Sequence, residues 1–339
     1  MLEGKAIYRD LFDHKPPAIH LVLAGTFYLF GDSTLSLRAI VIFFNIISAY
    51  VVYFFLRRVG ERLGRFGGIL FLLTVPLVHG TYALTEVFAL PFLLIFAYFI
   101  VRHSEKWYVI IGGISLGIAL LFKLTLLLTI LVTVLYLMTY PQRFSQKVKG
   151  ILYFCSGLLI PLIVLCVWLV RGRLLRDFYE QAIQYVALFY PPQITVQTLQ
   201  LLVFLSFSLC GFVLLSYRSF KNNVIQKEEK YVLLVIILSF IPSILYRPYH
   251  HYWILIIPFL IIFSIFGAKG SKWGQRILFF NASVIAAVWM IYSTVFGYPK
   301  LLYQIDTAEK IENCAGVHDP IMHFLTRCIP REKYFYQVK

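Results

Sequence analysis

Long uninterrupted apolar segments are the sequence feature that most constrains this chain. Runs of roughly 17 to 22 residues recur along most of its length, and few of them contain a charged residue. A helix of this length crosses the hydrocarbon core of a bilayer, whereas the strands of a membrane barrel alternate apolar and polar residues over about ten positions. The chain is therefore expected to be an all-α polytopic membrane protein.

The composition supports this class. Hydrophobic residues make up 60% of the chain and charged residues 14%, and the mean hydropathy is +0.79, so there is too little polar surface to cover a soluble domain. The net charge of +15 would suggest a nucleic-acid partner in a soluble protein. Here most basic residues lie in short loops between apolar runs, so membrane topology explains the charge and no nucleic acid is expected.

We expect a bundle of about ten transmembrane helices. The segments are 35–56, 66–84, 87–101, 107–122, 124–140, 151–170, 198–217, 231–246, 252–267 and 277–297. Residues 18–30 are apolar but cover only about half a bilayer, and they follow two prolines that can begin a helix but cannot continue one. This segment is predicted to be a juxtamembrane helix on the outer face.

The charge of the loops predicts the topology. Lysine and arginine are concentrated in the loops after residues 56, 101, 140, 217 and 267, which the positive-inside rule places in the cytoplasm. Both chain ends then lie on the extracytoplasmic side of the plasma (inner) membrane. We expect a transmembrane domain of residues 1–297, followed by an extracytoplasmic tail of residues 298–339. An outer N-terminus without a signal sequence requires a further helix upstream of Met1, so we expect an N-terminally truncated chain.

The side chains that could carry chemistry all fall on the outer side of this topology. Ionisable groups beside lipid require partners, which makes their convergence on one face informative. They are Asp10, Asp13, His14 and Lys15 before the juxtamembrane helix, Glu86 and Lys123 beside the early spans, Arg171, and Arg247, His250, His251 and Tyr252.

Several of these residues have a simpler structural interpretation. Glu86 could be favoured by the helix N-terminus, with Thr85 as a cap, or it could be a ligand of a divalent metal or of the acceptor, together with His14. Lys15 could extend to the headgroups. The tyrosines around His250 and His251 could anchor the chain at the interface, which leaves the nearby Arg247 unexplained.

The basic residues suggest a different role as a group. Lys15, Lys123, Arg171 and Arg247 could form an outer pocket for a lipid phosphate, since guanidinium and ammonium groups bind phosphate oxygens. In the tail, Cys314, His318, His323 and Cys328 have the types of zinc ligands, but their spacing matches no compact finger, and the two cysteines could instead form a disulfide.

Several motifs resemble those of a known superfamily. These are the segment 4–17, which includes Tyr8-Arg9-Asp10 and Lys15-Pro16-Pro17, the pair Thr85-Glu86, the segment 247–252 followed by Pro258, and the tail segment 324–336. They are similar to the polyprenyl- and dolichyl-phosphate-sugar glycosyltransferases of the GT-C fold, which include protein mannosyltransferases and aminoarabinose transferases. In that family the catalytic carboxylate follows the first membrane helix, upstream of the Tyr-Arg-Asp segment.

The resemblance implies transfer of a sugar from a polyprenyl phosphate to a lipid, protein or polysaccharide acceptor outside the membrane. Lys15, Lys123, Arg171, Arg247, His250, His251 and Tyr252 would bind substrate, and Asp10, Asp13 and Glu86 would support catalysis, with or without a divalent metal. A transporter or lipid flippase without bond chemistry is the main alternative, and a structural membrane subunit is a third.

Overall fold

The structure is a computed structural model that describes residues 4–102, 105–139, 144–188, 210–219, 221, 233–234, 236–240, 249–269 and 271–292. The chain divides into two compact units, Met1–Ile285 and Ala286–Lys339. The described part of the second unit is the end of one helix, so the tail segments with the four candidate zinc ligands lie outside the described residues.

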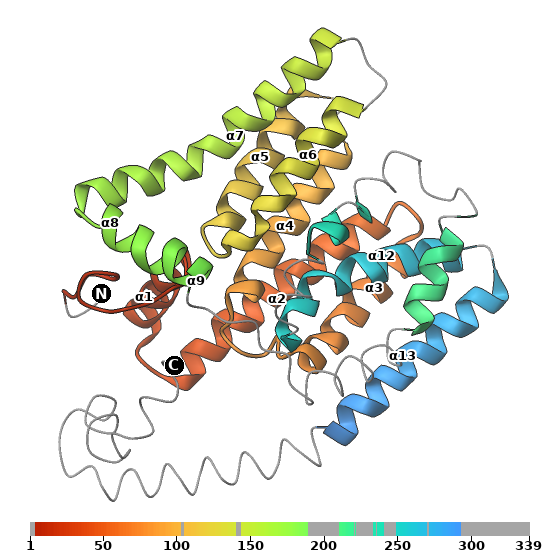
Figure 1. The fold of residues 1–339 in the computed structure, drawn as a ribbon. Helices are drawn as coiled ribbons and strands as arrows, with labels where there is room; N and C mark the ends of the chain where they lie inside the picture. The colour runs from red at the N-terminus through yellow and green to blue at the C-terminus, as the bar shows by residue number, and fades with distance from the viewer. Residues whose placement is uncertain are drawn as a thin grey trace, which may run out of the picture. The chain divides into compact units, whose positions relative to one another are not determined.

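The regular elements of the described residues are helices, which confirms the all-α class (Figure 1). In chain order they are α1 (Ala18–Phe30), α2 (Thr34–Leu56), α3 (Glu61–Thr74), η1 (Val75–Val78), α4 (Thr85–Val101), α5 (Lys106–Leu120), η2 (Leu124–Leu126), α6 (Leu127–Thr139), α7 (Phe144–Arg171), α8 (Leu175–Phe178), the π-helical η3 (Tyr179–Gln184), α9 (Tyr185–Leu188), η4 (His250–Leu255), α12 (Ile257–Ala268) and α13 (Lys272–Tyr292). Residues 210–219 are also helical.

Two of these helices, α2 and α7, are long and apolar enough to cross a membrane by length and composition. The helix predicted for residues 18–30 has these bounds, and its position at the membrane surface stays a prediction. The predicted span 66–84 is wrong in its bounds, because α3 begins after Gly60 and the chain changes to the 3-10 turn η1 around Pro76. Predicted spans 198–217 and 231–246 lie mostly outside the described residues, so the number of spans stays a prediction.

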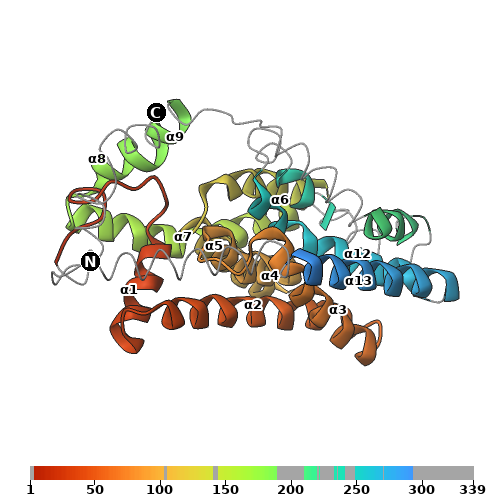
Figure 2. The ribbon, with the colours of Figure 1, turned by 90° about the horizontal axis from the view of Figure 1, so that it is seen from below.

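Small residues allow the helices to pack closely. The contact between α5 and α7 is extensive, and an added Cβ at Gly157 would lie 2.1 Å from the carbonyl oxygen of Ile110. Backbones approach this closely in membrane bundles only where side chains are absent. Helix α4 packs against both α5 and α2, and α2 packs against α3 (Figures 1 and 2).

Aromatic packing and one buried amide fix the start of α4. The Phe44 ring of α2 meets the Phe88 ring of α4 edge-on, with 4.8 Å between centroids. Asn45 donates hydrogen bonds to the carbonyl oxygens of Val41 and Gly80, at 3.0 and 2.9 Å, and so ties α2 to the segment that precedes α4. This anchoring holds the first turn of α4, which carries Glu86.

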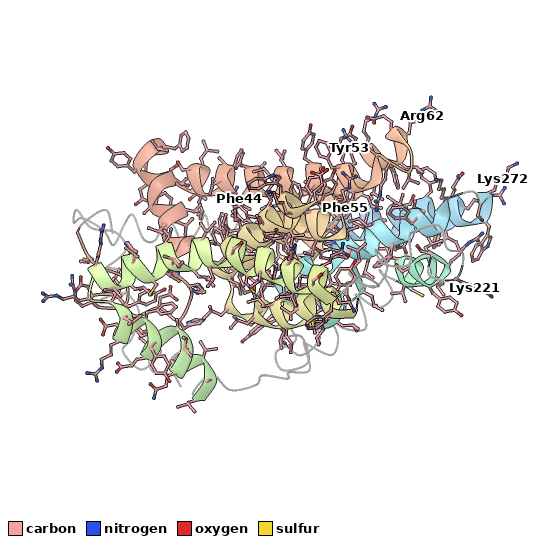
Figure 3. All side chains as sticks on the ribbon, turned by 90° about the horizontal axis from the view of Figure 1, so that it is seen from above. Phe44, Tyr53, Phe55, Arg62, Lys221 and Lys272 are labelled. Atoms are coloured by element: carbon pink, nitrogen blue, oxygen red, sulfur yellow. The ribbon has the colours of Figure 1, made fainter. Side chains whose placement is uncertain are left out.

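Three basic residues of the predicted cytoplasmic loops lie near one another. Figure 3 shows Arg62, Lys221 and Lys272 toward the same end of the described helices. All three belong to the lysine- and arginine-rich loops that the sequence places on one side of the membrane. The side of the membrane on which this end lies stays a prediction.

Candidate functional site

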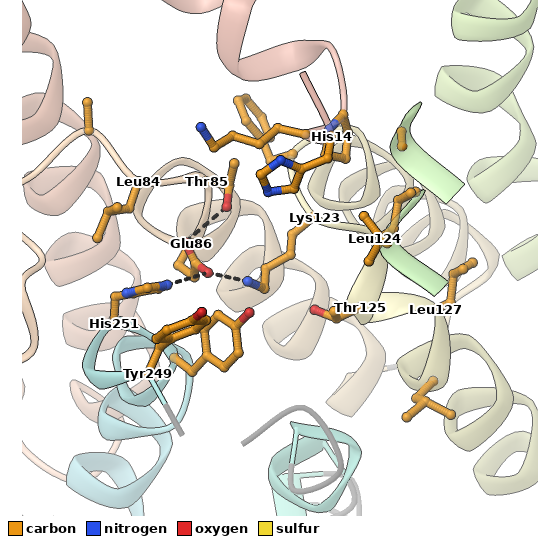
Figure 4. Close-up of a pocket in the computed structure, with 18 residues that line it drawn as sticks. His14, Leu84, Thr85, Glu86, Lys123, Leu124, Thr125, Leu127, Tyr249 and His251 are labelled. Carbon is orange, nitrogen blue, oxygen red and sulfur yellow. Dashed lines mark hydrogen bonds and ion pairs between the residues drawn. The ribbon is translucent and has the colours of Figure 1, made fainter. Parts of the chain in front are cut away.

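A cavity of about 810 Å³ lies where five segments of the first unit meet (Figure 4). Its walls come from the segment before α1, the start of α4, the turn from α5 into α6, the η3–α9 segment and η4. The lining residues are His14, Lys15, Pro16, Ala83, Leu84, Thr85, Glu86, Phe122, Lys123, Leu124, Thr125, Leu127, Leu128, Ala182, Val186, Tyr249, His251 and Tyr252.

A buried ion pair lies in the wall of this cavity. The Lys123 ammonium donates to the Oε1 atom of Glu86, and the two side chains are only 9% and 2% exposed. Thr85 donates its hydroxyl to Glu86 Oε2 at 2.9 Å. The predicted Thr85 cap is therefore wrong, because α4 has Leu84 at its N-cap position without a side-chain cap, and Thr85 binds the carboxylate instead.

Aromatic residues at the start of η4 pack against the ion pair. The Nζ atom of Lys123 lies 3.8 Å from the centroid of the Tyr252 ring, a cation–π geometry. The His251 Nε2 atom lies 3.6 Å from Glu86 Oε1, and its ring stacks on Tyr249 with 5.2 Å between centroids. Burial lowers the pKa of His251, although the Glu86 carboxylate opposes this shift, so the imidazole is neutral at pH 7.

Lys15 lines the cavity with a partly exposed side chain, so its ammonium group lies at the rim. Its side chain is 46% exposed, and its Nζ atom lies 3.9 Å from Asp13 Oδ2. The backbone of Lys15 is held at both ends: its N–H donates to Asp13 Oδ1 at 3.0 Å, and its carbonyl accepts from the Tyr8 hydroxyl at 2.7 Å. The ammonium group is therefore presented by a constrained backbone.

Asp13 does not line the cavity, but its carboxylate contacts residues beside the cavity. Burial alone would raise the pKa of its carboxyl, but the neighbouring His20 side chain, the charge of Lys15 and the hydrogen bond from the Lys15 N–H lower it overall. The distance between His20 Nε2 and Asp13 Oδ2 is 3.2 Å. The carboxylate is thus ionised and holds the residues around it.

The structure brings most of the predicted site residues together. His14, Lys15, Glu86, Lys123, His251 and Tyr252 all line the cavity. Arg247 lies outside the described residues, and the backbone of His250 is described in η4 but its side chain is not.

Besides Asp13, two more predicted site residues do not line the cavity. Asp10 is exposed and closes a turn, because it accepts a hydrogen bond from the Ala6 N–H at 2.6 Å and pairs with Arg9. Hydrogen bonding to the Ala6 N–H lowers its pKa. Arg171 is exposed at the end of α7 and does not line the cavity.

One residue at this site was not expected from the sequence. Gln181 of η3 contacts the backbone of the segment before α1, where its Oε1 atom accepts from the Asp13 N–H at 3.0 Å. An uncharged amide in an amphipathic segment gives no sequence signal of such a role.

Glu86 and His14, the two predicted metal ligands, both line the cavity. Among the described residues, no group of three His, Cys, Asp or Glu side chains is placed to hold one. The Lys123 ammonium binds the Glu86 carboxylate and would repel a cation there. The predicted metal ligands Glu86 and His14 stay a prediction.

Two comparisons relate this chain to known proteins. Residues 14–170, which contain Lys15, Glu86 and Lys123, match the family model of dolichyl-phosphate-mannose-protein mannosyltransferase. Among solved structures, the chain is similar to ArnT from Cupriavidus metallidurans bound to undecaprenyl phosphate, with 16% sequence identity and a TM-score of 0.59. The chain has the GT-C fold.

The similarity to ArnT covers 84% of this chain and 55% of the ArnT chain, so this GT-C chain spans little more than half the length of that relative. No curated protein matches the chain in sequence. The shared fold confirms the predicted GT-C fold, and the family model agrees with the predicted resemblance over residues 14–170.

Proposed function

We propose that this protein is a membrane glycosyltransferase that moves a hexosyl or pentosyl group from a polyprenyl-phosphate donor to an acceptor on the extracytoplasmic face of the plasma membrane. The observation that carries the proposal is the cavity, in which lysine side chains and an apolar wall face the same space. The acceptor would be a lipid, a protein or a polysaccharide.

The apolar and the basic parts of the cavity wall match the prenyl chain and the phosphate of such a donor. Leu124, Leu127, Leu128 and Val186 form an apolar surface on which a prenyl chain can lie. The exposed ammonium group of Lys15 can bind a phosphate at the rim. Because Lys123 is already paired with Glu86, we assign Lys15 the larger share of phosphate binding among the described residues.

In the transfer, an acceptor oxygen attacks the anomeric carbon and the bond from that carbon to the phosphate oxygen breaks. The bonding electrons leave with the phosphate, whose growing negative charge Lys15 stabilises. A general base takes the proton of the acceptor hydroxyl. Glu86 is the carboxylate among the lining residues, and we assign it and the neutral His251 the orientation of the acceptor.

The match of residues 14–170 to a glycosyltransferase family favours transfer over the transport alternative. The test compares wild type, Lys15→Met and Lys106→Met in lipid nanodiscs, for binding of undecaprenyl phosphate and for sugar transfer from a panel of polyprenyl-phosphate sugars. Lys106 is exposed at the start of α5 and serves as the matched control.

We expect Lys15→Met to weaken undecaprenyl phosphate binding by about tenfold, the size typical of losing one charge-assisted hydrogen bond. Lys106→Met should leave it unchanged, and neutral undecaprenol should bind the wild type and the Lys15 variant equally. Wild type that binds neither lipid, or transfers no sugar from any donor, contradicts the proposed function.

A further inference from the structure

We propose that Gln181 is a positioning residue that sets the location of Lys15 at the rim of the cavity. The inference rests on the proposed function, because it assigns a role in binding the donor phosphate. Gln181 does not line the cavity, so any effect on a ligand must pass through other residues.

Both ends of the Gln181 amide bind the segment before α1. Its Oε1 atom accepts from the Asp13 N–H at 3.0 Å, and its Nε2 atom donates to the carbonyl oxygen of Tyr8. These bonds join residues that are far apart in the sequence. A single side chain therefore fixes two points of the N-terminal segment against η3.

Tyr8 and Asp13, which form hydrogen bonds with Gln181, also form hydrogen bonds with the backbone of Lys15. Tyr8 donates its hydroxyl to the Lys15 carbonyl, and the Asp13 carboxylate accepts from the Lys15 N–H. Moving either residue would move the backbone that carries the ammonium group. The chain of contacts is continuous from the amide to the cation.

Tyr8 also has a backbone conformation that needs support. Its φ angle is +70°, which is costly for a residue with a side chain. The ring is buried and meets the Phe178 ring edge-on at 5.4 Å between centroids. Packing and the Gln181 hydrogen bond together hold Tyr8 in this conformation.

The element that carries Gln181 is itself part of the site. Gln181 lies in a π-helical turn, a rare conformation that is frequent at functional sites. The next residue, Ala182, and Val186 of α9 line the cavity. The same segment thus forms one wall and anchors the lysine rim beside it.

The first test is the affinity for undecaprenyl phosphate of full-length Gln181→Met, which keeps the side-chain length but removes both hydrogen bonds. Gln184→Met is the matched control, because Gln184 lies in the same π-helical turn and is exposed. We expect about tenfold weaker binding for Gln181→Met and no change for the control. Binding of neutral undecaprenol should not change in either variant.

A double-variant cycle separates positioning from general damage. If Gln181 acts through Lys15, adding Gln181→Met to Lys15→Met should weaken phosphate binding by less than about twofold. A loss as large as in the wild-type background overturns the proposal, as does unchanged binding by Gln181→Met alone.

Hydrogen–deuterium exchange of the ligand-free protein tests the anchoring even if the proposed function fails. The amides of Asp13 and Lys15 should exchange faster in Gln181→Met than in wild type. Gln181→Glu keeps an acceptor for the Asp13 N–H and should retain slow exchange there. Unchanged exchange in Gln181→Met overturns the proposal, whereas wild type that fails to bind undecaprenyl phosphate refutes only the donor assignment.

Discussion

Replacing Lys123 with methionine should destabilise the protein strongly. The substitution leaves the Glu86 carboxylate, which is 2% exposed, without its cation. Its remaining neighbours are the Thr85 hydroxyl at 2.9 Å and the His251 Nε2 atom at 3.6 Å. Removing one partner of a buried ion pair typically costs about 3–5 kcal/mol, and we expect Lys123→Met to fall in this range.

Removing the other charge of the pair, by Glu86→Gln, should reduce the free energy of unfolding by less. In Glu86→Gln the Lys123 ammonium keeps the Tyr252 ring, whose centroid is 3.8 Å away. A desolvated cation–π contact contributes about 2 kcal/mol, so the loss should be smaller by about this amount. The double variant, which removes both charges, should be more stable than Lys123→Met alone.

The assay is the free energy of unfolding in mixed micelles, from titration with a denaturing detergent and circular dichroism. Lys106→Met, at an exposed position, should change it by less than about 0.5 kcal/mol. A double variant that loses as much stability as the two single variants added together would refute the ion-pair reasoning, because independent sites are additive.

Two further predictions concern helix packing and pH. Gly157→Ala should lower the free energy of unfolding by about 1–3 kcal/mol, because the new Cβ would lie 2.1 Å from a carbonyl oxygen of α5. Gly25→Ala, with open space around it, should not lose stability. Equal effects of the two substitutions would contradict the packing account. Because burial lowers the pKa of His251, the unfolded chain binds the proton more readily, so stability should fall as the pH drops below about 6.5 and through the folded-state pKa. His251→Gln should show a weaker dependence in unfolding titrations from pH 8 to 5, and an identical profile would refute the assignment.

Hydropathy predicted several helices of this fold closely. Helix α1 has the expected bounds, and α2 begins where Ser33 accepts a hydrogen bond from the Ser36 N–H at 3.1 Å. The bounds of α3 could not be predicted this way, because its first turn is polar and Pro76 interrupts the apolar run that follows. Apolar length does not show where a helix changes to a 3-10 turn.

The sequence predicted most of the residues of the candidate site, but not the contacts between them. Glu86 and Lys123 are 37 positions apart, and the sequence gives no indication that they form an ion pair rather than bind separate ligands. Asp10 has the same residue type as Asp13, yet the fold places it in an exposed turn. Gln181 carries no charge, so its contact with Asp13 depends on the packing of η3, which only the structure shows.

The most direct test of the account is an experimental structure of the protein with undecaprenyl phosphate in a nanodisc. The account predicts phosphate density within hydrogen-bonding distance of Lys15 Nζ, with the prenyl chain along Leu124, Leu127 and Leu128. Phosphate density outside this cavity, or a prenyl chain bound on another face, would contradict it.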